Sequence, residues 1–271
     1  MGIKGQITEW SPAHIVGIVL LLAAAGASFI HPLPVIAFLL SYIVLCVAAC
    51  FFPQMNFLGP VISRGRTGEN IVALTFDDGP SQATTVKILD LLDRYSVKAA
   101  FFVSGMNAVQ CPDLISEIIR RGHSIGNHSY RHDPFVMLKG RQTLYREVGE
   151  ANRVLLQAGV HALAFRPPVG IVNPKLFPIL HELGLYCITF SLRAGDAGNY
   201  RVKHIAARIL KKVQPDDIIM LHDKPPRQAE DHLVLLGEIE KVLTGIRDKG
   251  LRIVPLSELA GREIMNVGQP Y

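Results

Sequence analysis

Two adjacent carboxylates, Asp77 and Asp78, are followed by Gly79-Pro80, which turns the backbone sharply. Neighbouring carboxylates repel each other unless a proton or a cation is shared between them. The structural alternative is that Asp78 or Ser81 only caps the helix that follows. Taken alone, this segment leaves both interpretations open.

Two histidines, His128 and His132, are four residues apart. Side chains at i and i+4 project from one face of a helical turn, as a metal needs when one segment supplies two nitrogens. The structural alternative is an ordinary pair of surface histidines. Together with one aspartate of the first pair, they would give three protein ligands and leave a coordination position for water, which is a catalytic arrangement.

Three further groups stand singly. Arg166 precedes Pro167-Pro168, and an arginine beside rigid prolines suits a fixed ion pair with a carboxylate, with a surface arginine in a plain loop as the alternative. Asp196 has the alternative of a turn residue, and His222, at the end of an apolar run, that of a structural histidine. The remaining histidines lie in apolar runs, at strand starts or on helices, and we interpret them as structural or surface residues: His14, His31, His123, His161, His181, His204 and His232.

Short β-rich runs alternate with helical ones from residue 71 onward. The predicted strands are residues 71–76, 99–103, 123–127, 162–166, 185–191, 217–221 and 252–255. The predicted helices are residues 84–95, 112–121, 143–157, 174–183, 202–213 and 230–249. Repeated strand–helix units require a parallel sheet, and seven strands favour a barrel or near-barrel, with an open doubly wound sheet as the alternative.

In either fold, catalytic groups lie at the carboxyl ends of the strands. Five of the seven strand ends present, in chain order, paired aspartates, paired histidines, an arginine, an aspartate and a histidine. Metal-assisted hydrolysis requires these types of group. Their order along the chain therefore favours the catalytic interpretation over the separate structural ones.

Residues 1–60 differ in composition from residues 61–271. Lys4 and Glu9 are their only charged residues, whereas the whole chain is 19% charged and 49% hydrophobic with a net charge of +5. Two apolar runs, residues 14–30 and 35–52, predict a transmembrane helical hairpin. The alternatives are a secretory signal, for which Ala23–Ala27 would offer a cleavage site, and a hairpin buried in a soluble protein.

Charge also predicts the topology of that hairpin. Lys4 precedes it, Arg64 and Arg66 follow it, and the turn has no lysine or arginine. The positive-inside rule therefore places both ends, and the domain at residues 61–271, on the cytoplasmic side of a bacterial-type inner membrane.

The composition excludes a disordered or coiled-coil protein. No basic stripe indicates nucleic acid as a partner, and the four cysteines indicate neither a disulfide framework nor a Cys-x-x-Cys metal pair.

The ordered motifs resemble those of the polysaccharide deacetylases with a NodB-type domain, carbohydrate esterase family 4. The resemblance covers about residues 70–259 and rests on four segments: Thr75–Pro80, Gly126–His132, Arg166–Gly170 and Leu221–Asp223. It implies a distorted (β/α)7 barrel and a divalent metal, commonly zinc. The implied metal ligands are Asp78, His128 and His132.

The resemblance also implies roles for the other groups. Asp77 would be the catalytic base, Arg166 would orient it, His222 would be the acid, and Asp196 would support His222. The segment Pro168, Val169 and Gly170 would contact substrate, and we expect a backbone N–H near Val169 to stabilise the oxyanion.

Two positions depart from the family pattern: Ala197 stands where a tryptophan is usual, and Val169 where an aromatic is common. Arg193 also stands where many members have an aspartate. We therefore expect an altered substrate groove rather than a different reaction.

The function expected from these features is hydrolysis of an N-acyl group, acetyl or formyl, from an amino sugar of a glycan or of a polyprenyl-linked carrier at the membrane. Two alternatives stay open. One is a carbohydrate O-acetyl esterase, since the same site can cleave both kinds of bond. The other is a non-catalytic, membrane-tethered sugar-binding module.

Overall fold

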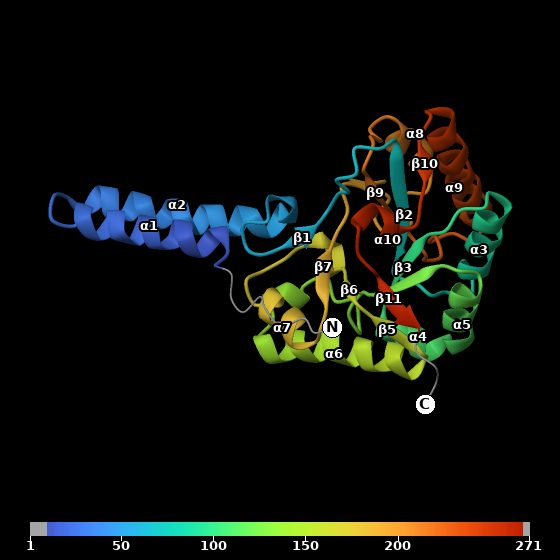
Figure 1. The fold of residues 1–271 in the computed structure, drawn as a ribbon, viewed down its shortest axis with the longest axis horizontal. Coiled ribbons are helices and arrows are strands. Elements are labelled where there is room, and N and C mark those ends of the chain that lie inside the picture. Colours follow the sequence, from blue (N-terminus) through green and yellow to red (C-terminus); the bar gives the residue numbers. More distant parts are fainter. Residues whose placement is uncertain (1–9, 268–271) are drawn as a thin grey trace.

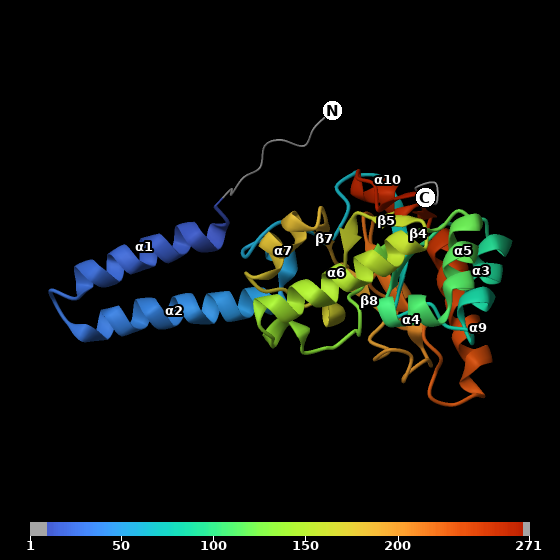
Figure 2. The same cartoon turned by 90° about the horizontal axis from the view of Figure 1, so that it is seen from below.

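The computed structural model describes residues 10–267, which form a pair of long helices and an α/β domain (Figure 1). The helices of the pair, α1 (Pro12–Ala27) and α2 (Pro32–Phe51), lie side by side in both views (Figures 1 and 2). Tyr42 of α2 packs against Gly17 of α1 and donates a hydrogen bond to the Ala13 carbonyl at 3.1 Å. We call α1 and α2 the helix pair.

The predicted bounds of 14–30 and 35–52 were too late for both helices. Pro32 and Pro34 lie in the first turn of α2, not between the helices. The first turn tolerates proline because its N–H groups have no partner within the helix. In the part of the chain that the structure describes, α2 alone is long and apolar enough to cross a membrane, with a mean hydropathy of 2.6, and α1 is shorter.

A parallel sheet forms the centre of the domain, in the order β1-β7-β6-β4-β3-β2-β9-β8, with β10 also paired to β2. Its edge strands are β1 and β8, so the sheet is an incomplete barrel, in agreement with the predicted distorted one. Its strands are β1 (Val61–Ile62), β2 (Ile71–Asp77), β3 (Ala100–Val103), β4 (Ser124–Asn127), β6 (Ala164–Phe165), β7 (Tyr186–Ile188), β8 (Leu192–Arg193), β9 (Ile218–His222) and β10 (Arg252–Ile253).

A small antiparallel pair joins β5 (Val160–Ala162) to β11 (Met265–Val267). The strands β1, β8 and β11 were not predicted. Each has two or three residues, which is too short for an alternation of apolar and polar positions. All seven residues of β2 are buried, as expected of a central strand covered on both faces.

Helices cover the sheet on both sides (Figures 1 and 2). The six predicted helices are confirmed with small changes at their ends: α3 (Thr85–Arg94), α5 (Pro112–Arg120), α6 (Arg141–Gln157), α7 (Leu176–Glu182), α8 (Ile205–Leu210) and α9 (Asp231–Asp248). Short elements that were not predicted are α4 (Gly105–Gln110), α10 (Leu256–Ala260), and the 3-10 turns η1 (Pro53–Met55), η2 (Val136–Leu138) and η3 (Pro168–Gly170).

Three apolar clusters hold these elements together. The largest one packs α3, α5 and α9 on the sheet, with buried residues at helical spacing such as Ile115 and Ile118 of α5 and Val242 and Ile246 of α9. A second cluster joins the base of the helix pair, at Ala13 and Ala49, to the region of α6 and α7. The helix pair is therefore packed against the same side of the domain that holds α7.

Candidate active site

The carboxyl ends of neighbouring strands bring the predicted site residues together. Asp77 ends β2 and His222 ends β9, and the two are register partners across this parallel pair. His128 follows β4, and Arg166 follows β6. Side chains from positions as distant in sequence as 77 and 222 therefore meet at one edge of the sheet.

Arg166 is fully buried beneath this edge. Its Nη1 donates to Asp77 Oδ1 and to Thr75 Oγ1, both at 2.7 Å, and its Nη2 donates to the Thr189 carbonyl at 2.8 Å. The guanidinium also lies 3.9 Å over the Phe102 ring. Burial lowers the pKa of Arg166, and the charge of Asp77 opposes that shift. Arg166 thus holds one oxygen of Asp77 in a fixed direction.

Three side chains at this edge can hold a metal. The nearest ligand atoms of Asp78, His128 and His132 all lie within 4.8 Å of one another. Asp78 Oδ1 is 3.6 Å from His128 Nε2 and 3.0 Å from His132 Nε2. Over residues 10–267, this is the single group of histidine, cysteine and acidic side chains close enough to share an ion.

The hydrogen bonds of these residues favour a cation between them. His128 Nδ1 lies 2.7 Å from the Arg166 carbonyl, which can only accept, so Nδ1 carries the proton and Nε2 presents a lone pair. That lone pair faces Asp78 Oδ1, a buried oxygen with no hydrogen-bond partner in the described residues. Two facing lone pairs repel unless a proton or a metal lies between them, so the donor set fits a divalent metal.

The charge state of Asp78 agrees with this. Burial alone would raise the pKa of this carboxyl, but hydrogen bonds and positive charge at His128 and His132 hold that pKa far below its ordinary value, and a cation at the Nε2 atoms would act in the same direction. Asp78 is therefore a carboxylate, as a ligand must be. The alternative in which Asp78 caps a helix is wrong: α3 begins at Thr85 with no side-chain cap from Asp78.

The segment that holds the two histidines is a loop, so the predicted helical turn is wrong. Ser129 and His132 have φ values of 65° and 53°. The Asn127 side chain accepts from the Ser129 N–H at 2.9 Å, and Ser129 Oγ accepts from the His132 N–H at 3.2 Å. These local bonds replace helical ones. They still bring the two rings together, with centroids 4.7 Å apart.

His222 and Asp196 form a second pair. His222 Nδ1 lies 2.8 Å from Asp196 Oδ2, and the Asp196 side chain is almost fully buried. Burial would lower the pKa of His222, but the hydrogen bond and charge of Asp196, with smaller contributions from Asp78 and Asp77, raise it overall. Since Nδ1 faces Asp196, Nε2 is the ring atom left to act on another molecule.

The expected substrate segment forms η3, directly after Arg166. Val169 has a φ of 55° and is half exposed, whereas Pro168 and Gly170 are buried. Among the departures, Arg193 is exposed on β8, and Ala197 begins a left-handed run, followed by Gly198. A Cβ at Gly198 would lie 3.8 Å from Asp78 Oδ2, so this run borders the candidate metal site.

Sequence reasoning missed a buried support under the aspartate pair. Asp223 accepts from Thr84 Oγ1 at 2.6 Å and from Thr85 Oγ1 at 2.5 Å, and its N–H donates to the Asp77 carbonyl at 2.7 Å. A Cβ on Gly79 would lie 2.4 Å from Asp223 Oδ2, so only glycine fits there. The position of Asp223 beside His222 was the only signal in the sequence.

The carboxyl of Asp223 differs in charge state from that of Asp78. Burial raises the pKa of Asp223 to about 6, with Asp78 adding to the shift and Thr84 and Thr85 opposing it. Asp223 therefore takes up a proton at mildly acidic pH, whereas Asp78 stays ionised.

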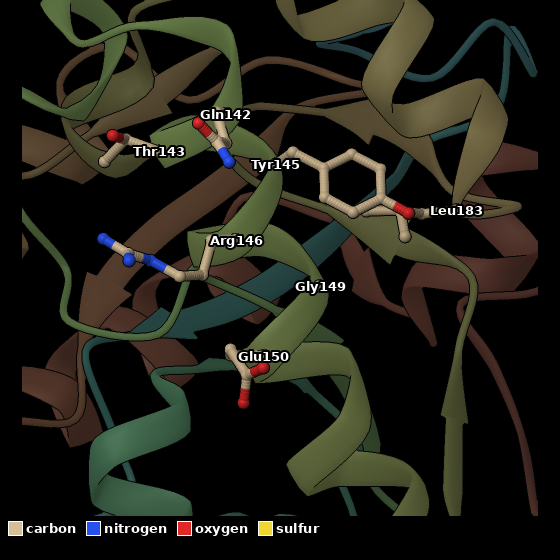
Figure 3. Close-up of a pocket in the computed structure, with 7 residues that line it drawn as sticks. All are labelled: Gln142, Thr143, Tyr145, Arg146, Gly149, Glu150 and Leu183. Carbon is tan, nitrogen blue, oxygen red and sulfur yellow. The ribbon is translucent and has the colours of Figure 1, made fainter.

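Other polar features lie elsewhere. His123 is buried and accepts from the Ala99 N–H at 3.1 Å, which is a structural role. Figure 3 shows a surface hollow on α6, and none of the expected site residues lines it. Its lining residues are Gln142, Thr143, Tyr145, Arg146, Gly149, Glu150 and Leu183.

Comparison with known proteins agrees with this geometry. The sequence profile of the polysaccharide deacetylase family matches residues 64–188. The chain is similar to a chitooligosaccharide deacetylase of Sinorhizobium fredii, with 35% identity over 213 residues that cover 76% of this chain and 98% of that protein. It is also similar to the peptidoglycan-N-acetylglucosamine deacetylase PgdA of Listeria monocytogenes, with 30% identity over 78% of this chain.

The chain spans only 43% of the length of the Listeria relative. Among solved structures, it is similar to a peptidoglycan N-acetylglucosamine deacetylase with a TM-score of 0.68 and 28% identity, over 75% of this chain and 94% of the other. The similarity to the Sinorhizobium protein extends over nearly the whole of that relative. The chain belongs to the polysaccharide deacetylase family.

Proposed function

We propose that this protein is a metal-dependent hydrolase that removes an N-acyl group, acetyl or formyl, from an amino sugar. One observation supports this most strongly: at the same edge of the sheet, the facing atoms of Asp78 and His128 are accompanied by an arginine-bound carboxylate, Asp77, and by a histidine bound to a buried aspartate, His222. A base, a cation site and an acid in one place are the parts that amide hydrolysis needs.

Asp78 Oδ1, His128 Nε2 and His132 Nε2 would hold the metal, for which we propose zinc. When bound, such an ion supplies a Lewis acid that polarises the acyl oxygen and lowers the pKa of a water. The three protein ligands leave room for that water.

Asp77 acts as the general base and takes a proton from the attacking water as its oxygen bonds to the acyl carbon. Arg166 is a positioning residue, because it holds Asp77 Oδ1 and leaves Oδ2 directed toward the histidine side, 3.8 Å from His128 Nε2. A backbone N–H near Val169 donates to the developing oxyanion.

His222 then acts as the general acid. Its Nε2 donates a proton to the amine nitrogen as the C–N bond breaks, which releases a carboxylic acid and a free amino sugar. Asp196 keeps the proton on Nδ1 and stabilises the cationic form of the ring. Pro168, Val169 and Gly170 contact the substrate next to this centre.

The helix pair is proposed to anchor the protein in a bacterial-type inner membrane as two spans. In this proposal, residues 1–60 form the membrane part, residues 61–271 form the catalytic domain, and that domain lies on the cytoplasmic side. A cytoplasmic site has no access to an extracellular polymer, so we favour an amino sugar on a polyprenyl carrier as substrate. A reporter fused to the C-terminus that reads out a periplasmic location would redirect the proposal to peptidoglycan or an exopolysaccharide.

An O-acetyl esterase remains the second candidate, because an alkoxide leaves more easily than an amine from the same site. Purified, zinc-loaded protein should be offered lipid-linked N-acyl sugars, N-acetylated oligosaccharides and acetylated xylan, with acetate and formate as the readouts. Release from acetylated xylan alone would favour the esterase. Bound metal with no acid released from any substrate would favour a non-catalytic sugar-binding module.

Two variants separate the roles of the paired aspartates. Asp77→Asn should retain stoichiometric zinc, because Asp77 is not a proposed ligand, and should lose activity by at least about 100-fold. Asp78→Asn should lose zinc as well as activity. Zinc content measured by elemental analysis, alongside acid release, checks both; an active Asp77→Asn variant removes Asp77 as the base.

A further inference from the structure

We propose that residues 133–139, the interface loop, insert their apolar side chains at the boundary between headgroups and acyl chains of the bilayer that the helix pair enters, and so hold the mouth of the active site against the membrane. The loop begins directly after His132 and includes η2. This inference rests on the proposed role of the helix pair as an anchor. It identifies the partner of this surface as lipid and the substrate as an amino sugar held at the membrane.

The interface loop presents apolar side chains on an ordered backbone. Phe135 and Leu138 are 65% and 80% exposed, whereas Val136 and Met137 between them are buried. Asp133 Oδ1 accepts from the Phe135 N–H at 2.8 Å, and the Leu138 N–H donates to the Phe135 carbonyl at 2.9 Å. Two large apolar groups are thus held outward by a turn whose inner residues are fixed in the core.

Hydrogen bonds connect the interface loop to the end of α2. Asn173 Nδ2 donates to the Met137 carbonyl at 2.6 Å, and the neighbouring Val172 N–H donates to the Cys50 carbonyl at 3.1 Å. Cys50 lies in the last turn of α2. Figures 1 and 2 show the helix pair meeting the domain on the side that holds α7 and the start of α6. The interface loop therefore lies beside the base of the helix pair.

Exposed aromatic residues mark that base. Trp10, next to the start of α1, and Phe51 and Phe52, at the end of α2, are all at least half exposed. Tryptophan and other aromatic side chains gather where a membrane protein crosses the boundary between hydrocarbon and headgroups. Phe135 and Leu138 extend this belt from the helix pair onto the catalytic domain.

The charges around the interface loop suit anionic headgroups. Lys139 and Arg141 are exposed and pair with Asp133 and Glu182, respectively. Lys175 donates to the Lys139 carbonyl at 2.6 Å and has no acidic partner in residues 10–267. Long cationic side chains beside an apolar patch are typical of a surface that lies in the membrane interface.

The position of His132 gives the loop a function. This proposed metal ligand is three positions from Phe135 in the sequence, so insertion of Phe135 would bring the metal site toward the lipid surface. A sugar attached to a membrane lipid would reach the site while its lipid stays in the bilayer. A long polymer would have to enter the site from the side. The interface loop therefore favours a lipid-linked amino sugar.

Fluorescence can test the insertion directly, because Trp10 is the only tryptophan in the chain. In a Trp10→Phe background, Phe135→Trp is compared with two matched single-tryptophan variants. Leu233→Trp, on the exposed face of α9, reports solvent, and Val44→Trp, on the exposed face of α2, reports lipid. Each full-length protein is placed in nanodiscs of phosphatidylcholine and phosphatidylglycerol, with and without brominated acyl chains.

We expect bromine to quench the Phe135→Trp and Val44→Trp variants at least about twofold and to leave the Leu233→Trp variant unchanged, since quenching requires the indole to reach the acyl region. If Val44→Trp is quenched but Phe135→Trp behaves like Leu233→Trp, insertion of the interface loop is refuted and the anchor stands. If neither Val44→Trp nor Phe135→Trp is quenched, both proposals fail. Protection of the Phe135→Trp indole only after a second protein is added would make the partner a protein instead of lipid.

A kinetic test uses Phe135→Ser/Leu138→Ser, which leaves every proposed catalytic residue in place. The KM for a lipid-linked amino sugar in nanodiscs should rise at least about tenfold, because two apolar side chains no longer enter the bilayer. The rate on a short, soluble N-acetylated oligosaccharide should stay unchanged, which distinguishes loss of docking from misfolding. An unchanged KM for the lipid-linked substrate would overturn the proposal.

Discussion

Replacing Arg166 with methionine should destabilise the protein strongly and through one partner, Asp77. The guanidinium is fully buried and makes three hydrogen bonds, one of them to Asp77 Oδ1. Removing one member of a buried ion pair leaves the other charge without compensation, which costs about 3–5 kcal/mol. Arg166→Met should lower the free energy of unfolding by about that amount.

A double-mutant cycle shows whether Asp77 is the reason. In Arg166→Met/Asp77→Asn, no charge is left buried alone, so at least about 2 kcal/mol of the loss should return. Arg166→Lys is the matched control. Its single ammonium keeps the charge but cannot reach both Asp77 and the Thr189 carbonyl as the two guanidinium nitrogens do, so an intermediate loss is expected.

The cycle should be measured on metal-free protein in detergent micelles, by urea titration followed with near-ultraviolet circular dichroism. Absence of metal separates the folding effect of the ion pair from any effect on ligand geometry. Two results would refute the reasoning: an Arg166→Met variant within about 1 kcal/mol of the parent, or a double variant that loses the sum of the two single losses.

Two further predictions concern pH. The acid form of His222 is the active one and Asp196 raises its pKa, so activity falls as pH rises through that pKa; Asp196→Asn should move this alkaline limb of kcat to lower pH and reduce kcat at neutral pH about 10- to 100-fold. An unmoved limb in a pH–rate profile would contradict the assignment. For Asp223, a folded pKa of about 6 against an ordinary 3.8 gives stability that is present below about pH 4 and lost as pH rises through about 6, amounting to about 3 kcal/mol. Asp223→Asn should abolish that slope in urea midpoints, and a slope equal to that of the parent would show that another group is responsible.

The parts of the site that lie at strand ends could be predicted from the sequence. An apolar run followed by a polar group places that group at the carboxyl edge of a parallel sheet, and this applies to Asp77, His128, Arg166 and His222 alike. The family resemblance then assigned roles that no single motif specifies. The helices were found for a similar reason, because faces such as Leu114, Ile115 and Ile118 repeat with the period of a helix.

The parts that depend on local side-chain bonds could not be predicted in this way. The loop after β4 looked like a helical turn because the spacing of His128 and His132 fits one. The side chains of Asn127 and Ser129 accept hydrogen bonds from nearby N–H groups, and these bonds determine the conformation of the loop. The spacing of the two histidines does not reveal such bonds. Asp223 was missed because its partners, Thr84 and Thr85, are far away in sequence, and two threonines at the start of a helix usually indicate only a cap.

The run from Ala197 to Asn199 shows how the site tolerates an unfavourable backbone. Ala197, Gly198 and Asn199 all have φ between 52° and 69°, a region that costs about 1–2 kcal/mol for a residue with a side chain. Asn199 Nδ2 offsets part of this by donating to the carbonyls of His222 and Lys224, at 3.0 and 2.6 Å. The bonds tie this run to the segment that carries the proposed acid.

These bonds hold the run at Ala197, the position where the family resemblance led us to expect a tryptophan. With Asn199 holding the run, Asp196 stays beside His222 without an aromatic ring packed over it. Ala197 and Gly198 place no large side chain beside Asp78. Small residues on this side and the apolar interface loop next to His132 fit the proposed substrate, a sugar whose carrier stays in the membrane. The departure at position 197 is therefore expected to affect which substrates fit, and to leave the acid pair intact.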